Sequence, residues 1–254
     1  MTNSTVLEAV NVYKSFGKTP IINDFSLKVE RGQRHAIIGP NGAGKTTVYN
    51  LFSGRYEPTA GRIMLNGSDI TGLPPYKINR LGMARSFQIT NIFPKLTVFE
   101  NVRAVVMAKH HVYFNFFTSI ARWKQPSSET LAIIEQTGLR DKLDVLAGNL
   151  AYGEQRALEI ALTVASDPQL ILLDEPTAGM SVDETREAIK LINAITRGKT
   201  LIIIEHDMEV IFNLADTITV LQYGKVLTTG SPEEIRGDVR VKEAYLGDEN
   251  VCYS

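Results

Sequence analysis

An α/β fold organised around a phosphate-binding loop is predicted by three features of this 254-residue sequence. Residues 39–46 match the pattern G-x-x-x-x-G-K-[ST]. Short apolar runs typical of buried strands alternate with segments of helical periodicity. Two of these runs, at residues 170–175 and 200–207, end in acidic or histidine side chains, which is typical of parallel strands that meet at a site.

The composition favours one large domain covering residues 1–254. Hydrophobic residues make up 44% of the chain, enough for a full core. A net charge of -1 argues against nucleic acid as a partner. The single cysteine, Cys252, cannot form an internal disulfide. Because the sequence has no targeting segment and no apolar run of membrane-spanning length, we expect a soluble protein that reaches a membrane only through a partner.

The phosphate-binding loop lies between an apolar run at residues 35–38 and a segment of helical character at residues 46–53, as the motif requires. Its glycines allow backbone N–H groups to turn toward an anion, and the helix N-terminus adds partial positive charge. We expect Lys45 to reach the β and γ phosphates of ATP and Thr46 to bind Mg²⁺. The residues assigned here to nucleotide binding are Gly39, Pro40, Asn41, Gly42, Ala43, Gly44, Lys45, Thr46 and Thr47.

Two alternating segments before the loop, residues 7–13 and 25–29, predict half-buried strands of an antiparallel sheet beside the nucleotide. The turn between them is expected at residues 17–20. Phe16, just ahead of this turn, is either a platform on which an adenine ring stacks or a packed core aromatic.

The segment after the loop predicts short strands at residues 62–66 and 83–87, with a helix starting near Pro75 between them. Gln88 directly follows the second strand. From residue 94 to about residue 150 the periodicity is helical, which predicts an inserted helical lobe with a polar break at residues 125–128.

Two features of this lobe have both a structural and a functional interpretation. Residues 112–117 are rich in aromatic side chains and form either a partner surface or a small hydrophobic core. His110 and His111 are adjacent rather than four residues apart, so they do not share a helix face. We therefore interpret them as surface histidines rather than as a metal-binding pair.

The second half of the chain predicts the reactive edge of the sheet. Residues 150–155 open a helix, and the glycine at its start leaves backbone donors exposed. The apolar run at residues 170–173 predicts a central parallel strand that carries Asp174 and Glu175 to its C-terminal end. There Asp174 would hold magnesium and Glu175 would polarise water, since adjacent strand residues point to opposite faces.

The remaining segments predict the rest of the sheet. A strand at residues 200–204 should neighbour the one carrying Glu175, and it leads to His206. This histidine is either structural or in contact with the terminal phosphate or the attacking water. A hairpin is expected to turn at residues 223–224, followed by a helix from Pro232.

Taken in order, the phosphate-binding loop, Gln88, residues 150–155, the 174–175 acids and His206 resemble the ATP-binding cassette of ABC transporters across nearly the whole chain. The resemblance implies a P-loop NTPase core of the RecA-like type, with an antiparallel β lobe and a helical lobe. It assigns catalysis to Glu175, His206, Gln88 and Lys45, and the metal to Thr46, Gln88 and Asp174. It also assigns nucleotide contacts to Phe16 and to Tyr152, Gly153 and Glu154 of the family signature.

Within this family, residues 84–88, 96–102 and 243–247 look like those of the ATPase subunits of branched-chain amino acid importers. The resemblance implies ATP hydrolysis that powers uptake by nucleotide-driven closure of a dimer, at the cytoplasmic face of the inner or plasma membrane. The implied partners are transmembrane permease subunits, a second ATPase subunit, either a paralogue or another copy, and indirectly a periplasmic or extracellular substrate-binding protein. Urea or short-amide import and lipopolysaccharide export are the alternatives, because related ATPases serve those systems.

Two departures from the family pattern concern the dimer: the altered signature is expected to weaken closure of a homodimer, and Ser181 to affect communication across it. The signature usually reads Leu-Ser-Gly-Gly-Gln, whereas here Ala151 replaces the serine, Tyr152 the first glycine and Glu154 the glutamine. A hydroxyl donor to the γ phosphate is therefore missing. Ser181 stands where the loop after the catalytic glutamate usually has aspartate.

A soluble cassette ATPase of translation or DNA repair is the main alternative outside transport. Translation relatives usually carry two cassettes in one chain, and repair relatives carry long coiled coils or zinc insertions. The sequence has one cassette, one cysteine and no basic tract, which fits neither class. A regulatory cassette that binds nucleotide without hydrolysis is a third interpretation, based on the altered signature.

Overall fold

The computed structural model describes residues 5–85, 92–110 and 124–246. Its strands are β1 (Thr5–Phe16), β2 (Thr19–Glu30), β3 (Arg34–Ile38), β4 (Ala60–Leu65), β5 (Ser68–Asp69), β6 (Met83–Arg85), β7 (Leu170–Asp174), β8 (Thr200–Ile204), β9 (Thr217–Gln222) and β10 (Lys225–Gly230). Its α-helices are α1 (Lys45–Phe52), α2 (Pro75–Arg80), α3 (Val98–Lys109), α4 (Lys124–Gln136), α5 (Tyr152–Ala165), α6 (Val182–Ile195), α7 (Met208–Leu214), α8 (Pro232–Gly237) and α9 (Val239–Leu246). Short 3-10 turns cover Arg140–Lys142 and Ala147–Asn149.

The first sheet is antiparallel, with strand order β2-β1-β4-β5, as the alternating N-terminal segments predict. Both long strands extend beyond the predicted cores, so the connecting turn contains only residues 17–18. Gly17 adopts a φ of 60° there, in the left-handed region that glycine tolerates best. Phe16 pairs directly with Thr19 across the turn and therefore lies at the tip of the hairpin.

The second sheet has strand order β10-β9-β3-β8-β7-β6, with β10 antiparallel to its neighbour and the other strands parallel. This order confirms that the strand leading to His206, β8, lies next to β7. The hairpin β9–β10 turns at residues 223–224, as predicted. Because parallel strands end at one edge, the phosphate-binding loop after β3, Asp174 on β7 and the segment after β8 all lie at that edge.

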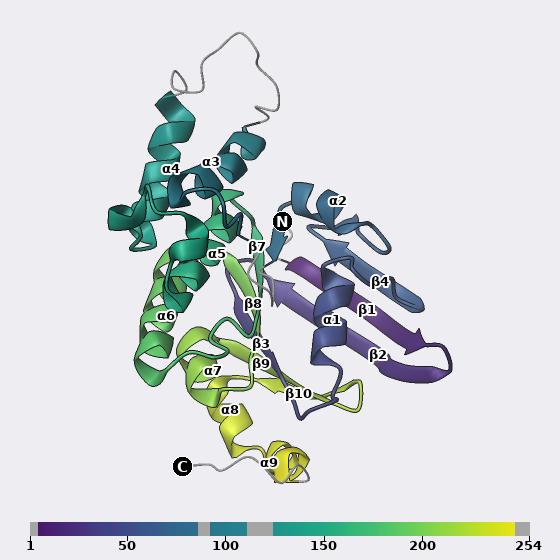
Figure 1. The fold of residues 1–254 in the computed structure, drawn as a ribbon. Helices are drawn as coiled ribbons and strands as arrows, with labels where there is room; N and C mark the ends of the chain where they lie inside the picture. Colours follow the sequence, from purple (N-terminus) through teal and green to yellow (C-terminus); the bar gives the residue numbers. More distant parts are fainter. Residues whose placement is uncertain (1–4, 86–91, 111–123, 247–254) are drawn as a thin grey trace.

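The two faces of the parallel sheet are covered by different elements. One face packs against α1 and the antiparallel sheet, and its core includes Ile37, Leu172 and Ile204. The other packs against helices α6 to α9 and against Ile160 and Val164 of α5. Figure 1 shows the parallel sheet between the antiparallel sheet and these helices. Helices α1 and α5 therefore pack on opposite faces of the same sheet.

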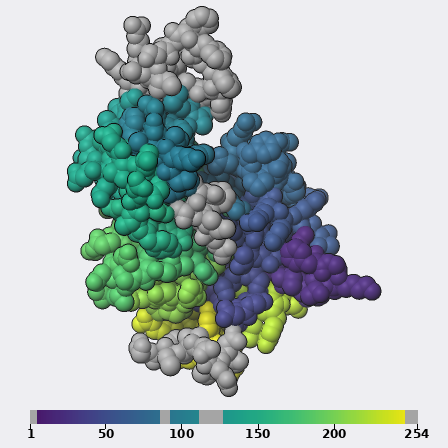
Figure 2. Space-filling model, viewed as in Figure 1, coloured from purple at the N-terminus to yellow at the C-terminus, as the bar shows by residue number. Residues whose placement is uncertain are grey.

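The helices α3, α4 and α5 share a separate hydrophobic cluster, which includes Val102, Ile134 and Leu158. In Figure 2 this teal part of the chain lies above the green part, and the blue part lies beside it. The predicted polar break at residues 125–128 is wrong, because helix α4 runs through it. Pro126 falls in the first turn of α4, where a missing backbone N–H is tolerated.

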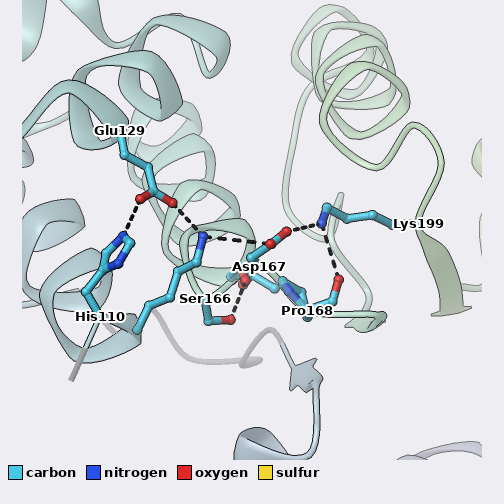
Figure 3. Close-up of polar contacts among 8 residues, drawn as sticks. His110, Glu129, Ser166, Asp167, Pro168 and Lys199 are labelled. Carbon is cyan, nitrogen blue, oxygen red and sulfur yellow. Dashed lines mark hydrogen bonds and ion pairs between the residues drawn. The ribbon is translucent and has the colours of Figure 1, made fainter. Parts of the chain in front are cut away.

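A chain of polar contacts joins this helical part to the loops at the other edge of the sheet (Figure 3). Glu129 of α4 contacts Lys109 at 2.6 Å and His110 at 2.7 Å. Asp167, in the turn between α5 and β7, lies 3.7 Å from Lys109 and 2.7 Å from Lys199. His110, at the end of α3, is thus partly exposed and paired with the Glu129 carboxylate of α4.

Several predicted features lie outside the described residues, namely Gln88, His111, Cys252 and the aromatic run at residues 112–117. Within the described ranges, no helix is both long and apolar enough to cross a bilayer. The helix expected from Pro232 is present as two short helices, α8 and α9, that meet at Asp238.

Candidate nucleotide site

The phosphate-binding loop is a tightly packed turn between β3 and α1. At Gly39, a Cβ would lie 2.2 Å from the carbonyl oxygen of Leu221 on β9, so a side chain does not fit. Gly44, the N-cap of α1, has a φ of 104°, which again requires glycine. The N–H of Gly224 donates to the carbonyl of Ala43 at 3.0 Å and ties the loop to the β9–β10 turn. The loop is therefore held in shape by backbone contacts from two neighbouring strands.

Lys45 lies folded over this loop. Its Nζ donates to the carbonyl oxygens of Gly39 at 2.7 Å and Pro40 at 3.0 Å. Asn41, Gly42 and Thr46 are exposed around it, and Thr47 is half-buried. Cationic Nζ, backbone N–H groups at the start of a helix and an exposed hydroxyl are the groups that bind phosphates and their metal ion.

Asp174 lies at the end of β7 with only 3% of its surface exposed. Burial raises the pKa of its carboxyl to about 6, and the charge of Glu175 adds to this effect, while Arg85 and Lys45 lower it. The influence of Lys45 shows that the loop and the acid are in electrostatic range. A carboxylate and a hydroxyl are hard oxygen donors, so Asp174 and Thr46 fit a magnesium ion.

Glu175 and His206 face each other at the end of β7 and β8. Glu175 Oε1 lies 3.6 Å from His206 Nδ1, and the two side chains are 36% and 66% exposed. The backbone of Glu175 has a φ of 46°, an unfavourable conformation for a residue with a side chain. Strained residues of this kind concentrate at functional sites. The pair is thus accessible to a ligand and held in a constrained geometry.

Phe16 is 45% exposed, so it is not a core residue. Its ring meets Tyr56 edge to face, with ring centroids 5.2 Å apart, and Lys14 Nζ lies 5.0 Å from its centroid. Gly44 packs against Ile22 of β2, which places the start of this strand at the phosphate-binding loop. Phe16 itself pairs with Thr19, three residues before Ile22 on the same strand, and its exposed ring is the kind of surface that base stacking requires.

The signature residues lie at the N-terminus of α5. The Tyr152 hydroxyl donates to the carbonyl of Ala178 at 2.9 Å, in the loop after Glu175. Glu154 accepts a hydrogen bond from the Ala151 N–H at 2.9 Å and pairs with Lys142 at 3.0 Å. The backbone hydrogen bond from Ala151 and the Lys142 ammonium hold the pKa of the Glu154 carboxyl below its usual range. Glu154 therefore stabilises the start of the helix, a role that its place in the signature did not predict.

Two further residues at the site were missed by the sequence reasoning. Arg85 on β6 is half-buried, donates to the Ser53 hydroxyl at 2.8 Å and lowers the pKa of Asp174. Its signal was a cation inside a short buried strand. Tyr56, which supports Phe16, follows α1 in a polar turn and has no sequence signal of its own.

Comparison with known proteins places this geometry in a family. The profile of the ABC transporter family matches residues 22–178, and that of the branched-chain amino acid ATP-binding cassette transporter matches residues 225–250. The high-affinity branched-chain amino acid transport ATP-binding protein BraF of Pseudomonas aeruginosa is 40% identical, over 96% of this chain and 98% of that protein. The corresponding protein LivG of Escherichia coli is 37% identical, over 92% and 94%. The lipopolysaccharide export system ATP-binding protein LptB of Acidithiobacillus ferridurans is 33% identical, over 97% and 98%.

Solved structures agree with this likeness. A nucleotide-free ATP-binding cassette from an ABC transporter superposes with a TM-score of 0.81 at 26% identity, covering 96% of this chain and all of that one. The ADP conformation of an ATP-binding cassette gives a TM-score of 0.81 at 25% identity, covering 96% and 99%. The fold and the loop define a P-loop nucleotide-binding protein. The chain belongs to the ABC transporter family of ATP-binding proteins, and members of this family hydrolyse ATP.

Proposed function

We propose that this chain is the ATP-hydrolysing subunit of an importer for branched-chain or related amino acids. The observation that carries the proposal is the nearly full-length likeness to BraF and LivG, together with the C-terminal match at residues 225–250. LptB, an ATP-binding protein of lipopolysaccharide export, is also similar to this chain, but at a lower identity. Lipopolysaccharide export is therefore the second candidate.

Each residue of the site has a separate role in the transfer of the terminal phosphoryl group of ATP to water. Lys45 and the backbone N–H groups of residues 39–46 hold the phosphates, and Phe16 stacks on the base. Thr46, Asp174 and Gln88 would hold magnesium, which would supply positive charge to the phosphate oxygens. Glu175 accepts the proton of the attacking water, and His206 positions that water against the terminal phosphate.

The active unit is a dimer of cassettes. Helix α1 and the signature helix α5 pack on opposite faces of one sheet. We therefore expect the signature of a second subunit, rather than that of the same chain, to close over the phosphate-binding loop. Tyr152, Gly153 and Glu154 of that helix start would then face the partner's nucleotide. Because Ala151 offers no hydroxyl, we favour a paralogous ATPase with an intact signature as the second subunit.

Residues 1–254 form one nucleotide-binding domain, with the helical lobe at about residues 94–150. The chain sits peripherally at the cytoplasmic face of the membrane, bound to permease subunits, and is served indirectly by a substrate-binding protein.

Reconstitution tests this function. The chain is purified with the membrane subunits that it retains, placed in vesicles with the matching substrate-binding protein, and supplied with ATP. We expect ATP-dependent uptake of labelled leucine, and none with Glu175→Gln. Uptake of urea instead, stimulation by lipopolysaccharide without amino acid uptake, or a chain that retains no membrane subunit contradicts the proposal.

A further inference from the structure

Glu205 is a buried carboxylate, 1% exposed, between strand β8 and His206, and the chemistry above does not use it. One of its oxygens, Oε1, accepts hydrogen bonds from the N–H of Thr177 at 3.2 Å and from the Thr177 hydroxyl at 2.6 Å. The other, Oε2, accepts from the N–H of His206 at 3.0 Å. A single carboxylate thus joins the segment after Glu175 to the segment that carries His206.

The burial of Glu205 decides what kind of role it has. A buried charge is tolerated when donors satisfy it, and three donors do so here. An enclosed side chain of this kind is out of reach of a nucleotide, whereas Glu175 and His206 are open to one. Glu205 therefore acts on the reaction without touching the nucleotide, through the residues that it holds and through its charge, which helps to raise the pKa of the Asp174 carboxyl.

Glu175 needs such support because its backbone is in the left-handed region, with φ at 46°. Its N–H donates to the carbonyl of Ile204 at 2.8 Å, and the N–H of Ala178 donates to its carbonyl at 3.1 Å. The contact between Glu205 and Thr177 falls two residues after Glu175 and fixes the segment from its other side. The two segments joined in this way carry Glu175 Oε1 and His206 Nδ1, which lie 3.6 Å apart.

We propose that Glu205 is a positioning residue for ATP hydrolysis, which holds Glu175 and His206 at their working separation through Thr177 and the His206 backbone. The inference rests on the proposed roles of Glu175 and His206. This positioning role requires a carboxylate at residue 205. A glutamine would offer its oxygen to Thr177 but would turn its amide donor toward the donor N–H of His206.

The test separates nucleotide affinity from turnover. In Glu205→Gln we expect kcat to fall roughly ten- to hundredfold, because small misplacements of reacting groups have effects of this size. The Kd for ATP, measured by titration, should stay within about twofold of wild type, since no group that contacts the nucleotide changes. Glu209→Gln makes the same charge change at an exposed position of α7 and should alter neither quantity.

A second variant keeps the test decisive if Glu205→Gln does not fold. Thr177→Val removes the hydroxyl donor while keeping the side-chain shape, and it should also lower kcat at unchanged Kd. The double variant should lose less than the product of the two single losses, because both changes break the same link.

Several results would overturn the inference. The first is a wild-type kcat in Glu205→Gln or, if that variant does not fold, in Thr177→Val. The second is a parallel loss of ATP affinity and turnover. The third is that the two changes act independently in the double variant. Glu175→Gln is measured alongside. Wild-type turnover in that variant refutes the proposed catalytic roles themselves, whereas wild-type turnover in Glu205→Gln alone refutes only the role of Glu205.

Discussion

The Asp174 carboxyl, which we propose as a magnesium ligand, destabilises the folded chain when it is ionised. Burial, followed by the charge of Glu175, raises the pKa of this carboxyl from 3.8 to about 6. The folded chain therefore holds this proton more tightly than the unfolded chain does. Stability falls as the pH rises from about 4 to about 6, and the ionised carboxylate remains unfavourable above that window. A bound magnesium ion would offset this penalty.

We predict that Asp174→Asn stabilises the metal-free protein at pH 7.5. The gain in the free energy of unfolding should be on the order of 1–3 kcal/mol, because a shift of about two pKa units corresponds to that range and Arg85 loses a partner. At pH 4 the gain should shrink to a small part of this value, since the wild-type carboxyl is then protonated in the folded state and about half protonated in the unfolded state. Urea unfolding at both pH values measures this. Equal stability of the two proteins at pH 7.5 would show that burial does not strain the carboxylate.

The exposed face of Phe16 leads to a prediction about nucleotide choice. Phe16→Ala should weaken ATP and GTP binding alike, by about fivefold or more, because stacking contributes about 1 kcal/mol and does not distinguish bases. Tyr76→Ala removes another exposed aromatic, on α2, and serves as the control. Calorimetric titration of both nucleotides gives the answer. Unchanged affinities in Phe16→Ala would make its contact with Tyr56 purely structural.

At the scale of one element, the N-terminus of α5 lacks a side-chain cap because its N-cap residue is alanine. Helices α3, α6 and α8 each have a serine or threonine at the same position, with the full reciprocal capping box. In α5 only the Glu154 half of this arrangement is possible. One substitution can therefore restore a cap and a signature hydroxyl together.

We predict that Ala151→Ser increases the free energy of unfolding by about 0.5–2 kcal/mol and so raises the melting temperature. It should also raise the ATPase activity of the chain alone. Ala151→Asn separates the two effects, since asparagine caps a helix without supplying a hydroxyl. It should stabilise the protein without raising activity. If both variants gain activity equally, helix capping rather than contact with the γ phosphate limits the enzyme.

Elements with strong local signals were predictable from the sequence, and residues that act through tertiary contacts were not. The strand, glycine loop and helix at residues 35–53 follow from their own periodicity, and so does the β9–β10 hairpin. The break expected at residues 125–128 failed because a polar first turn around Pro126 looks like a loop. Glu205 carried no separate signal, since its partner Thr177 is distant in sequence. The contact of Glu154 with Lys142 could not be predicted either, because the signature motif says nothing about a partner outside it.

For the molecule as a whole, we propose that one chain does not close its own site. The loop helix α1 and the signature helix α5 lie on opposite faces of the parallel sheet. Hydrolysis by the chain alone should therefore rise with protein concentration, and a partner ATPase and membrane subunits should increase it further. The specific activity measured over a hundredfold dilution series distinguishes this from a self-sufficient monomer, whose specific activity would stay constant.

The most direct test of the account is the mass and turnover of Glu175→Gln with magnesium and ATP. The substitution removes the proton acceptor but keeps its shape, so ATP should bind and persist. Light scattering after size exclusion should show a monomer without nucleotide and an ATP-bound dimer with it, and the added Ala151→Ser change should increase the dimer. Turnover should fall at least about a hundredfold. Wild-type turnover, or a monomer at every ATP concentration in both variants, would contradict a nucleotide-driven dimer with Glu175 at its catalytic centre.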